Sequence, residues 1–450
     1  MDGGRSVNGM HIAFDLSFTH TEGRWARAGS WIGRDFPDAR MYMELAQTAE
    51  RAGVDMLFFG DGTGIPDTWR GSIAPAVEWG IQWPRHDMSP VIAAVSTVTS
   101  AIGFGLTYSS TFMHPFYVAR LLNSLDHVTN GRIAFNVVAS TRSADAANYG
   151  YDELPEHDLR YERMEEFVGV CQALWDSVTP DAIIRDRASG RFADPAKIAP
   201  INHRGRFFSV RGPLPAVPSP QVRPVLVQAG NSARGIAASA RFADVVFGFG
   251  ANLRGQQRHR ERLDEALTAE GRKPESVGIL WATQVIVGRT TEEAKARRAH
   301  VLEFWDTEAV GAFLSHNMGY DLSRLPAAFR LGDLRDEIHA AQASQAGLIG
   351  ALVAEYGDDH RMSREEFFEH GWKSATGIDH SIVGDAGTIA DALEENFAAT
   401  GSRGGYMFST PLSMPSGFGE IAELLVPELR RRGVLAPRYP GRTLRENLAG

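Results

Sequence analysis

The sequence predicts an α/β protein, folded as a (β/α)8 TIM barrel with insertions. Short apolar segments of strand length alternate with amphipathic helical segments along the whole chain, which is the pattern of a parallel sheet. Eight such strands can be identified, and polar residues follow several of them directly. Because α/β barrels with insertions accommodate 450 residues, we expect one domain over residues 1–450, with insertions at about 181–223 and 290–388.

The expected strands are short, apolar and rich in branched side chains. They are His11–Leu16, Met56–Phe59, Ile102–Tyr108, Ile133–Ser140, Pro224–Ala229, Asp244–Phe249, Val277–Val287 and Gly405–Ser409. Helical spacing of apolar residues predicts the helices Met41–Ala52, Pro90–Thr99, Pro115–Leu125, Tyr161–Asp176 and Gly419–Arg431.

Two longer segments do not fit a simple alternation of strands and helices. Residues 181–223 are rich in Pro, Gly and Arg, and we expect an irregular insertion over the barrel mouth. Residues 290–388 are too many for one crossover helix, so they should hold an extra helical region that includes Trp305–Leu314 and Arg364–Glu369.

Composition excludes several classes of protein. The net charge of -9 and the lack of a long basic run argue against a nucleic-acid binder. Cys171 is the only cysteine, so no disulfide framework or thiolate metal cluster is expected. No apolar run has signal-peptide or membrane-spanning length, so we expect a cytoplasmic protein without membrane insertion.

Polar residues follow the predicted strands, where a barrel would bring them to one mouth. They include Ser17 and His20, Asp61, Thr107, Asn136 with Ser140, and Gly230–Ser232. Hydroxyls, amides and glycines with few carboxylates suit a polar ligand that is neutral or anionic. The first strand lacks a His-x-His pair, so we expect no metal site.

Two motifs suggest how such a ligand could be held. The turn Gly230–Gly235 joins a strand to a helix, and its backbone N–H groups with a Ser232 cap could bind a phosphate near Arg234. An ordinary capped turn is the alternative. His157, Arg160 and Tyr161 begin a helix, with Asp158 as the expected N-cap, and plain surface capping is the alternative there.

Several blocks in order resemble the flavin-dependent monooxygenases of the bacterial luciferase superfamily. The branch concerned contains nitrilotriacetate, EDTA, dibenzothiophene-sulfone and long-chain alkane monooxygenases. The blocks are Phe18–Trp25, Leu125–Ser140, Glu156–Arg163, Val210–Pro213, Val227–Ser232 and Val426–Leu429. Two positions depart from the usual pattern, because Ala139 stands in place of Thr and Phe135 in place of Trp.

The resemblance implies a luciferase-like barrel that binds reduced FMN (FMNH2) and uses O2 to oxygenate an organic molecule. It places Asp61, Thr107, Asn136 and Ser140 along the isoalloxazine ring and ribityl chain. It places His157, Tyr161, Gly230, Asn231 and Ser232 at the ribityl and phosphate end. His20 and His316 match positions near the reactive face of the flavin, where either could donate a proton or steer substrate, although either could instead be a buried structural histidine.

The sequence also gives expectations for the partner proteins and the substrate. Gly248–Gly250 lacks a dinucleotide fingerprint, so a separate NAD(P)H:flavin reductase should supply FMNH2. We also expect a homodimer or homotetramer. Phe14, Phe18 and Phe249 suggest a pocket for a small apolar, aromatic or heterocyclic substrate, including organosulfur compounds, although core packing explains such residues equally well. A deazaflavin-dependent dehydrogenase and a catalytically silent flavin-binding barrel remain the alternatives.

Overall fold

The computed structural model describes residues 9–17, 24–26, 36–250, 252–303, 306–340, 347–410 and 415–449. Eight parallel strands within these residues close into a barrel, in the order β10-β9-β4-β3-β2-β1-β15-β11, and β10 pairs with β11 to complete the ring. The strands are β1 (His11–Asp15), β2 (Met56–Phe59), β3 (Gly103–Ser109), β4 (Ile133–Val138), β9 (Val225–Gln228), β10 (Val245–Gly248), β11 (Gly278–Gly288) and β15 (Gly404–Ser409). The predicted (β/α)8 barrel is therefore confirmed, with every strand end within two residues of its expected position.

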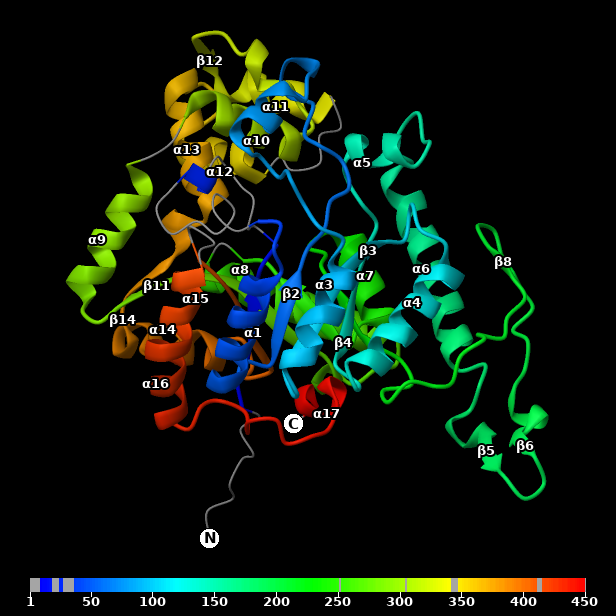
Figure 1. Ribbon diagram of the computed structural model, residues 1–450. Coiled ribbons are helices and arrows are strands. Elements are labelled where there is room, and N and C mark those ends of the chain that lie inside the picture. The colour runs from blue at the N-terminus through cyan, green and yellow to red at the C-terminus, as the bar shows by residue number, and fades with distance from the viewer. Residues whose placement is uncertain are drawn as a thin grey trace.

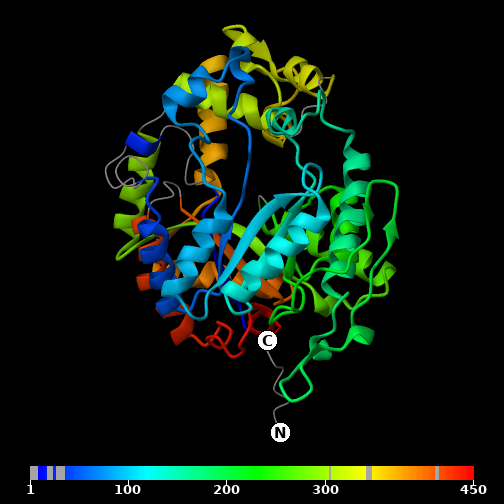
Figure 2. The same ribbon diagram turned by 45° about the vertical axis from the view of Figure 1, so that its right-hand side comes forward.

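Helices surround the barrel on its outer face (Figures 1 and 2). They are α1 (Arg40–Ala52), α3 (Met88–Val95), α4 (Pro115–Val128), α6 (His157–Trp175), α7 (Ala233–Phe242), α8 (Leu253–Ala269), α14 (Ala386–Ala399), α15 (Pro415–Glu420) and α16 (Val426–Arg431). A single π-helical turn, Ile421–Leu425, joins the last two, so the predicted terminal helix is one continuous run. The short α17 (Leu444–Leu448) closes the amino-terminal end of the barrel, where Leu444 packs among the inward-facing residues.

Successive side chains of each barrel strand point alternately inward and outward, so the barrel has one core inside it and a second between the strands and the helices. Ala13, Phe58, Ala134 and Phe247 point into the barrel, where they pack with other inward side chains. Their neighbours in sequence point outward into the layer between barrel and helices. Phe14 belongs to that outer layer: it is fully buried, with its ring 5.1 Å from that of Phe418. Its expected place in a substrate pocket is therefore wrong, because it faces away from the barrel interior.

Most of the segment 290–388 forms a helical cap over the carboxyl ends of the strands (Figure 1). The elements of the cap are α10 (Thr307–Met318), β12 (Ala328–Arg330), α11 (Leu331–Ala340), α12 (Gly347–Tyr356), β13 (Arg361–Ser363) and α13 (Arg364–Thr376). The other two elements, α9 (Thr291–Leu302) and β14 (Ile382–Asp385), lie beside the barrel, where β14 pairs with β11. Together with α2 (Ala74–Trp79), the cap has its own hydrophobic core, which includes Trp69, Phe367, Phe368 and Trp372. The expected extra helical region is therefore present and lies over the mouth.

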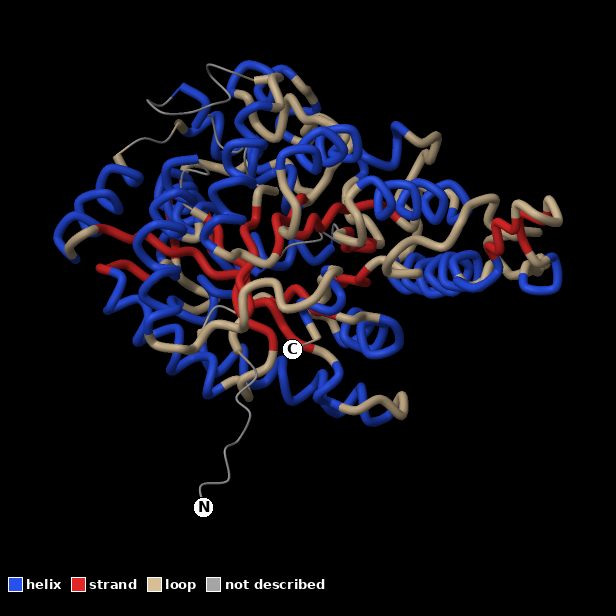
Figure 3. Tube along the Cα trace, turned by 60° about the horizontal axis from the view of Figure 1, so that its bottom comes forward, coloured by secondary structure: helices blue, strands red, loops and turns tan. Residues whose placement is uncertain are grey.

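The segment 181–223 does not cover the mouth, contrary to expectation. It forms two small hairpins, β5 (Ile183–Asp186) with β6 (Arg191–Ala193) and β7 (His203–Arg204) with β8 (Ser209–Val210). The first hairpin projects from the side of the molecule (Figure 3). The rest of the segment packs on α6 and α4: Phe207 and Phe208 donate backbone N–H groups to Glu166, and the Gln221 amide donates to Asp126. These contacts fix the insertion to the outer helices.

Candidate active site

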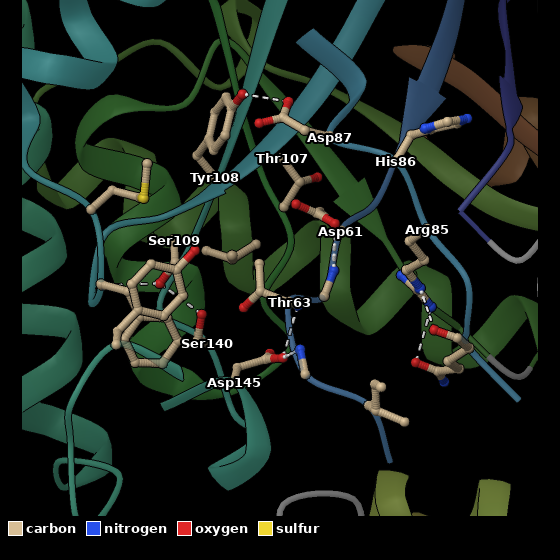
Figure 4. Close-up of a pocket in the computed structure, with 18 of the residues that line it drawn as sticks. Asp61, Thr63, Arg85, His86, Asp87, Thr107, Tyr108, Ser109, Ser140 and Asp145 are labelled. Atoms are coloured by element: carbon tan, nitrogen blue, oxygen red, sulfur yellow. Dashed lines mark hydrogen bonds between the residues drawn. The ribbon is translucent and has the colours of Figure 1, made fainter. Parts of the chain in front are cut away.

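A cavity of about 450 Å³ lies beside the carboxyl ends of β2, β3 and β4 (Figure 4). Residues from the ends of these strands and from the segments that follow them line it, among them Asp61, Thr63, Arg85, Thr107, Ser109, Phe112, Ser140, Asp145 and Tyr149. Three of the predicted site residues, Asp61, Thr107 and Ser140, are thus brought together at one wall. This location matches the rule that ligands bind at the carboxyl end of a parallel barrel.

Asn136 lies beside Thr107 in the floor below this cavity. The two residues are direct partners in the β3–β4 register, and the Asn136 amide donates to the Thr107 hydroxyl at 2.9 Å. Thr107 in turn donates to the backbone oxygen of Phe59 at 2.9 Å. The buried Asn136 Oδ1 has no hydrogen-bond partner in the described part of the chain, so it keeps one acceptor available for a ligand.

Backbone and side-chain geometry are restricted at Ser140. Its φ of 52° lies in the left-handed region, where a non-glycine residue is strained, and its hydroxyl donates to Ser109 at 2.7 Å. Strain of this kind is typical of ligand sites, because surrounding contacts must hold it in place.

Asp61 follows β2 and faces the same cavity as Thr107 (Figure 4). Burial raises the pKa of its carboxyl, and the backbone N–H of Gly62 and the charge of Arg85 lower it in part. A second carboxylate, that of Asp145 on α5 (Ser143–Asn148), accepts the backbone N–H groups of Thr63 and Gly64 at 2.9 and 2.6 Å. Asp145 therefore fixes the loop that carries Asp61.

A second group of predicted residues lies at the starts of α6 and α7, and we call it the α6–α7 cluster: His157, Tyr161, Gly230, Asn231 and Ser232. The His157 and Tyr161 rings are 5.0 Å apart, and Ser232 caps α7 by accepting the Gly235 N–H at 3.0 Å. These five residues do not line the cavity described above. The predicted cofactor residues therefore form two groups at the mouth.

Close packing shapes the α6–α7 cluster. A Cβ atom on Gly235 would lie 2.9 Å from the Gly230 Cα and 3.0 Å from the Tyr161 hydroxyl, so both glycines are required by the approach of the backbone. Arg234 pairs with Glu165 rather than standing free as a counter-charge. Arg160 instead is buried, and its Nε and Nη1 atoms have no hydrogen-bond partner among the described residues.

The helix that carries Arg160 and Tyr161 begins earlier than expected. The first residue of α6 is His157 and its N-cap is Glu156, so the expected capping role of Asp158 is wrong. Asp158 instead contacts the His157 ring at 2.7 Å.

His316 lies on α10 in the cap, with 5% of its surface exposed. Burial lowers its pKa to about 3, and the charges of Arg142 and Arg85 add to the effect, so the ring is neutral at pH 7. The buried Nε2 has no hydrogen-bond partner within the described ranges. His316 can thus hydrogen-bond a ligand, but it is not an imidazolium acid.

The other predicted residues are placed only in part. Phe249 follows β10, is 43% exposed, and has its ring 4.5 Å from Phe247. His20 and Phe18 lie outside the described residues. Sequence reasoning missed Arg142 and Asp145, which occur in a loop and a one-turn-and-a-half helix where no periodic pattern marks them.

Comparison with known proteins identifies the family. The model of the luciferase-like monooxygenases matches residues 13–404. The chain belongs to this family. It is 32% identical to the dibenzothiophene-sulfone monooxygenase of Rhodococcus erythropolis (strain XP), over 98% of this chain and 96% of the relative. It is 35% identical to the N-acetyl-S-(2-succino)cysteine monooxygenase of Bacillus subtilis (strain 168), over 93% and 92%.

A solved riboflavin lyase, in a structure with modified FMN and riboflavin, has the same architecture. It superposes with a TM-score of 0.85 at 28% identity, covering 98% of this chain and 96% of its own. The predicted resemblance is confirmed, and this luciferase-like protein is a flavin-dependent monooxygenase. In the described part of the chain, no helix has both the length and the apolar character needed to cross a membrane.

Proposed function

We propose that this luciferase-like monooxygenase is the oxygenase component of a two-component system. It takes reduced FMN from a separate NAD(P)H:flavin reductase and uses O2 to oxygenate a small organic substrate. The observation that carries the proposal is the end-to-end similarity to monooxygenases in a chain whose barrel mouth holds both polar groups of residues. The modified FMN in the riboflavin lyase structure supports FMN as the flavin.

The residues at the mouth fit FMN on three structural features. Arg160 has buried N–H groups without described partners, which suits a phosphate. The N-terminus of α7, with its close glycine pair, offers backbone N–H groups to the same anion. The open acceptor on Asn136 suits a ring N–H. The α6–α7 cluster would hold the ribityl phosphate, and Asp61, Thr107, Asn136 and Ser140 would hold the ring.

Each part of the chain then has a task. When bound, reduced FMN supplies the two electrons that activate O2. The cap of α10–α13 lies over the mouth and would exclude water from it. His316 would accept or donate one hydrogen bond as a neutral ring. His20 and Phe18 stay predictions for the reactive face and the substrate pocket.

The substrate pocket combines apolar and polar surface. The rings of Phe112 and Tyr149 stack at 5.0 Å with an interplanar angle of 7°, and Met113 and Val138 line the same cavity. An apolar or aromatic part of a substrate would pack there. One relative acts on a sulfone and another on a thioether acid, which supports an organosulfur compound.

The test is product analysis by mass spectrometry with 18O2. Sulfones, thioethers, alkanes and aminocarboxylates would be supplied with FMN, NADH and a generic flavin reductase. We expect one 18O atom in a product only when the reductase is present. Efficient NADH oxidation by the chain and FMN alone would contradict the two-component scheme. Turnover with a reduced deazaflavin under strict anaerobiosis would instead favour the dehydrogenase, and FMN binding without any product would favour the silent barrel.

A further inference from the structure

Two arginines meet next to the cavity, beside the loop that follows β2. Arg85 lies in the segment before α3 and lines the cavity, and Arg142 is the N-cap residue of α5. A Cβ atom on Gly62 would lie 2.5 Å from Arg142 Nη1 and 3.7 Å from Arg85 Nη1. Both guanidinium groups therefore come close to the same point, beside Gly62.

No carboxylate of the described chain forms an ion pair with either arginine. Arg85 donates Nε and Nη2 to the backbone and side-chain oxygens of Gln82, both at 3.0 Å, and its Nη1 has no such partner. The Arg142 guanidinium group forms no hydrogen bond to a side chain or backbone oxygen of the described residues, and its backbone oxygen accepts the Ala146 N–H. Asp145 Oδ1 accepts two backbone N–H groups and Asp61 Oδ1 accepts the Gly62 N–H, so both carboxylates act on the arginines as nearby charges, without an ion pair among these described residues.

Burial and neighbouring charges act on both arginines. Burial and the charge of Arg142 lower the pKa of Arg85 to about 10, and Asp61 and Asp145 raise it in part. Burial also lowers the pKa of Arg142, while the charges of Asp145 and Asp61 raise it. Burial, followed by the charges of the same two arginines, lowers the pKa of His316, so its ring is neutral at pH 7. A carboxylate of a ligand would use the guanidinium N–H donors that no described group accepts.

We propose that Arg85 and Arg142 bind a carboxylate of the substrate, so that the enzyme oxygenates an organic acid. This inference rests on the proposed function and names the substrate class of the same site. Planar guanidinium groups match the geometry of a carboxylate, and two of them give a specific, charge-assisted contact. The Phe112–Tyr149 stack, which lines the same cavity as Arg85, takes the apolar remainder of the acid.

Binding of matched acids and esters tests the assignment. The probes are thiodiacetate, (phenylthio)acetate and benzoate, each compared with its methyl ester by calorimetry on the full chain. We expect at least one acid to bind at least tenfold more tightly than its ester. Arg142→Gln should abolish that preference, Arg142→Lys should keep part of it, and Arg120→Gln, which removes an exposed charge on the outside of α4, should leave it unchanged.

Three results would overturn the assignment. The first is that none of the acids binds more tightly than its ester. The second is an equal loss of acid and ester affinity in Arg142→Gln. The third is a loss of FMN affinity in Arg142→Gln with the acid preference intact, which would assign the arginines to the flavin.

Product analysis separates failure of this inference from failure of the proposed function. Acid binding that depends on Arg142, without incorporation of 18O into any product, would leave the carboxylate site standing and contradict the monooxygenase scheme. Equal kcat/KM for acids and esters, with 18O in both products, would support the monooxygenase scheme and contradict the carboxylate site.

Discussion

Removal of the Asp145 carboxylate should loosen the loop that carries Asp61. Asp145 is 6% exposed and accepts the N–H groups of Thr63 and Gly64. Each hydrogen bond to a charged acceptor contributes about 1.5–3 kcal/mol, and water recovers part of it when the loop opens. We therefore expect Asp145→Ala to weaken the local structure by about 2–4 kcal/mol, which at about 1.4 kcal/mol per factor of ten corresponds to roughly 30- to 1000-fold faster amide exchange.

Hydrogen exchange read by mass spectrometry measures this change locally, on peptides that contain Thr63 and Gly64. Asp145→Asn is the matched control, because its amide oxygen can still accept from both N–H groups, and we expect less than half the effect. Unchanged protection of the two amides in Asp145→Ala would refute the reasoning, since it would show that the carboxylate does not hold the loop.

Three further predictions concern buried groups. Burial raises the pKa of Asp15 to about 6, above its ordinary value of 3.8, so the folded state loses stability as pH rises from about 4 to 6. Asp15→Asn should therefore raise the Tm more at pH 7.5 than at pH 4.5. The gain in the free energy of unfolding should be about 2 kcal/mol larger at pH 7.5, and an equal gain at both pH values would contradict this. The buried Arg132 donates to five acceptors in two stretches of chain, residues 96–102 and Thr129. Each buried acceptor left without a donor costs about 1–3 kcal/mol, so Arg132→Ala should lower the Tm sharply and Arg132→Lys should lower it less; similar Tm values for both variants would be the contrary result. Burial lowers the pKa of His316 to about 3, so its ring should show no titration by NMR between pH 5 and 8. A titration midpoint near 6.5 would contradict the burial of this ring in the cap.

The fold could be predicted closely because the barrel strands are buried on both faces. Such strands are continuous apolar runs bounded by turn residues, and this pattern fixes their positions within two residues. The sequence predicts Thr107 and Asn136 at the same barrel mouth, and the β3–β4 register makes them direct partners. The orientation of Phe14 follows from alternation, because its neighbour Ala13 faces the barrel interior and Phe14 must then face the helices.

The arginine pair could not be predicted in the same way. Arg85 and Arg142 come from two loops 57 residues apart, and they meet beside Gly62, on a loop whose next residues are held by Asp145. Likewise, the path of residues 181–223 depends on Glu166 and Asp126 of the outer helices, whose carboxylates accept from it. Long-range polar contacts of this kind leave no periodic signal in the sequence.

Amide hydrogen exchange of the full chain with and without FMN tests the location of the flavin site most directly. We expect FMN to slow exchange at the starts of α6 and α7, in peptides containing Tyr161 and Ser232, and in the loop around Asp61. Peptides of the β5–β6 hairpin should be unchanged and serve as the internal control. Protection confined to other regions, or an absence of protection at saturating FMN, would contradict a flavin site at the mouth of this barrel.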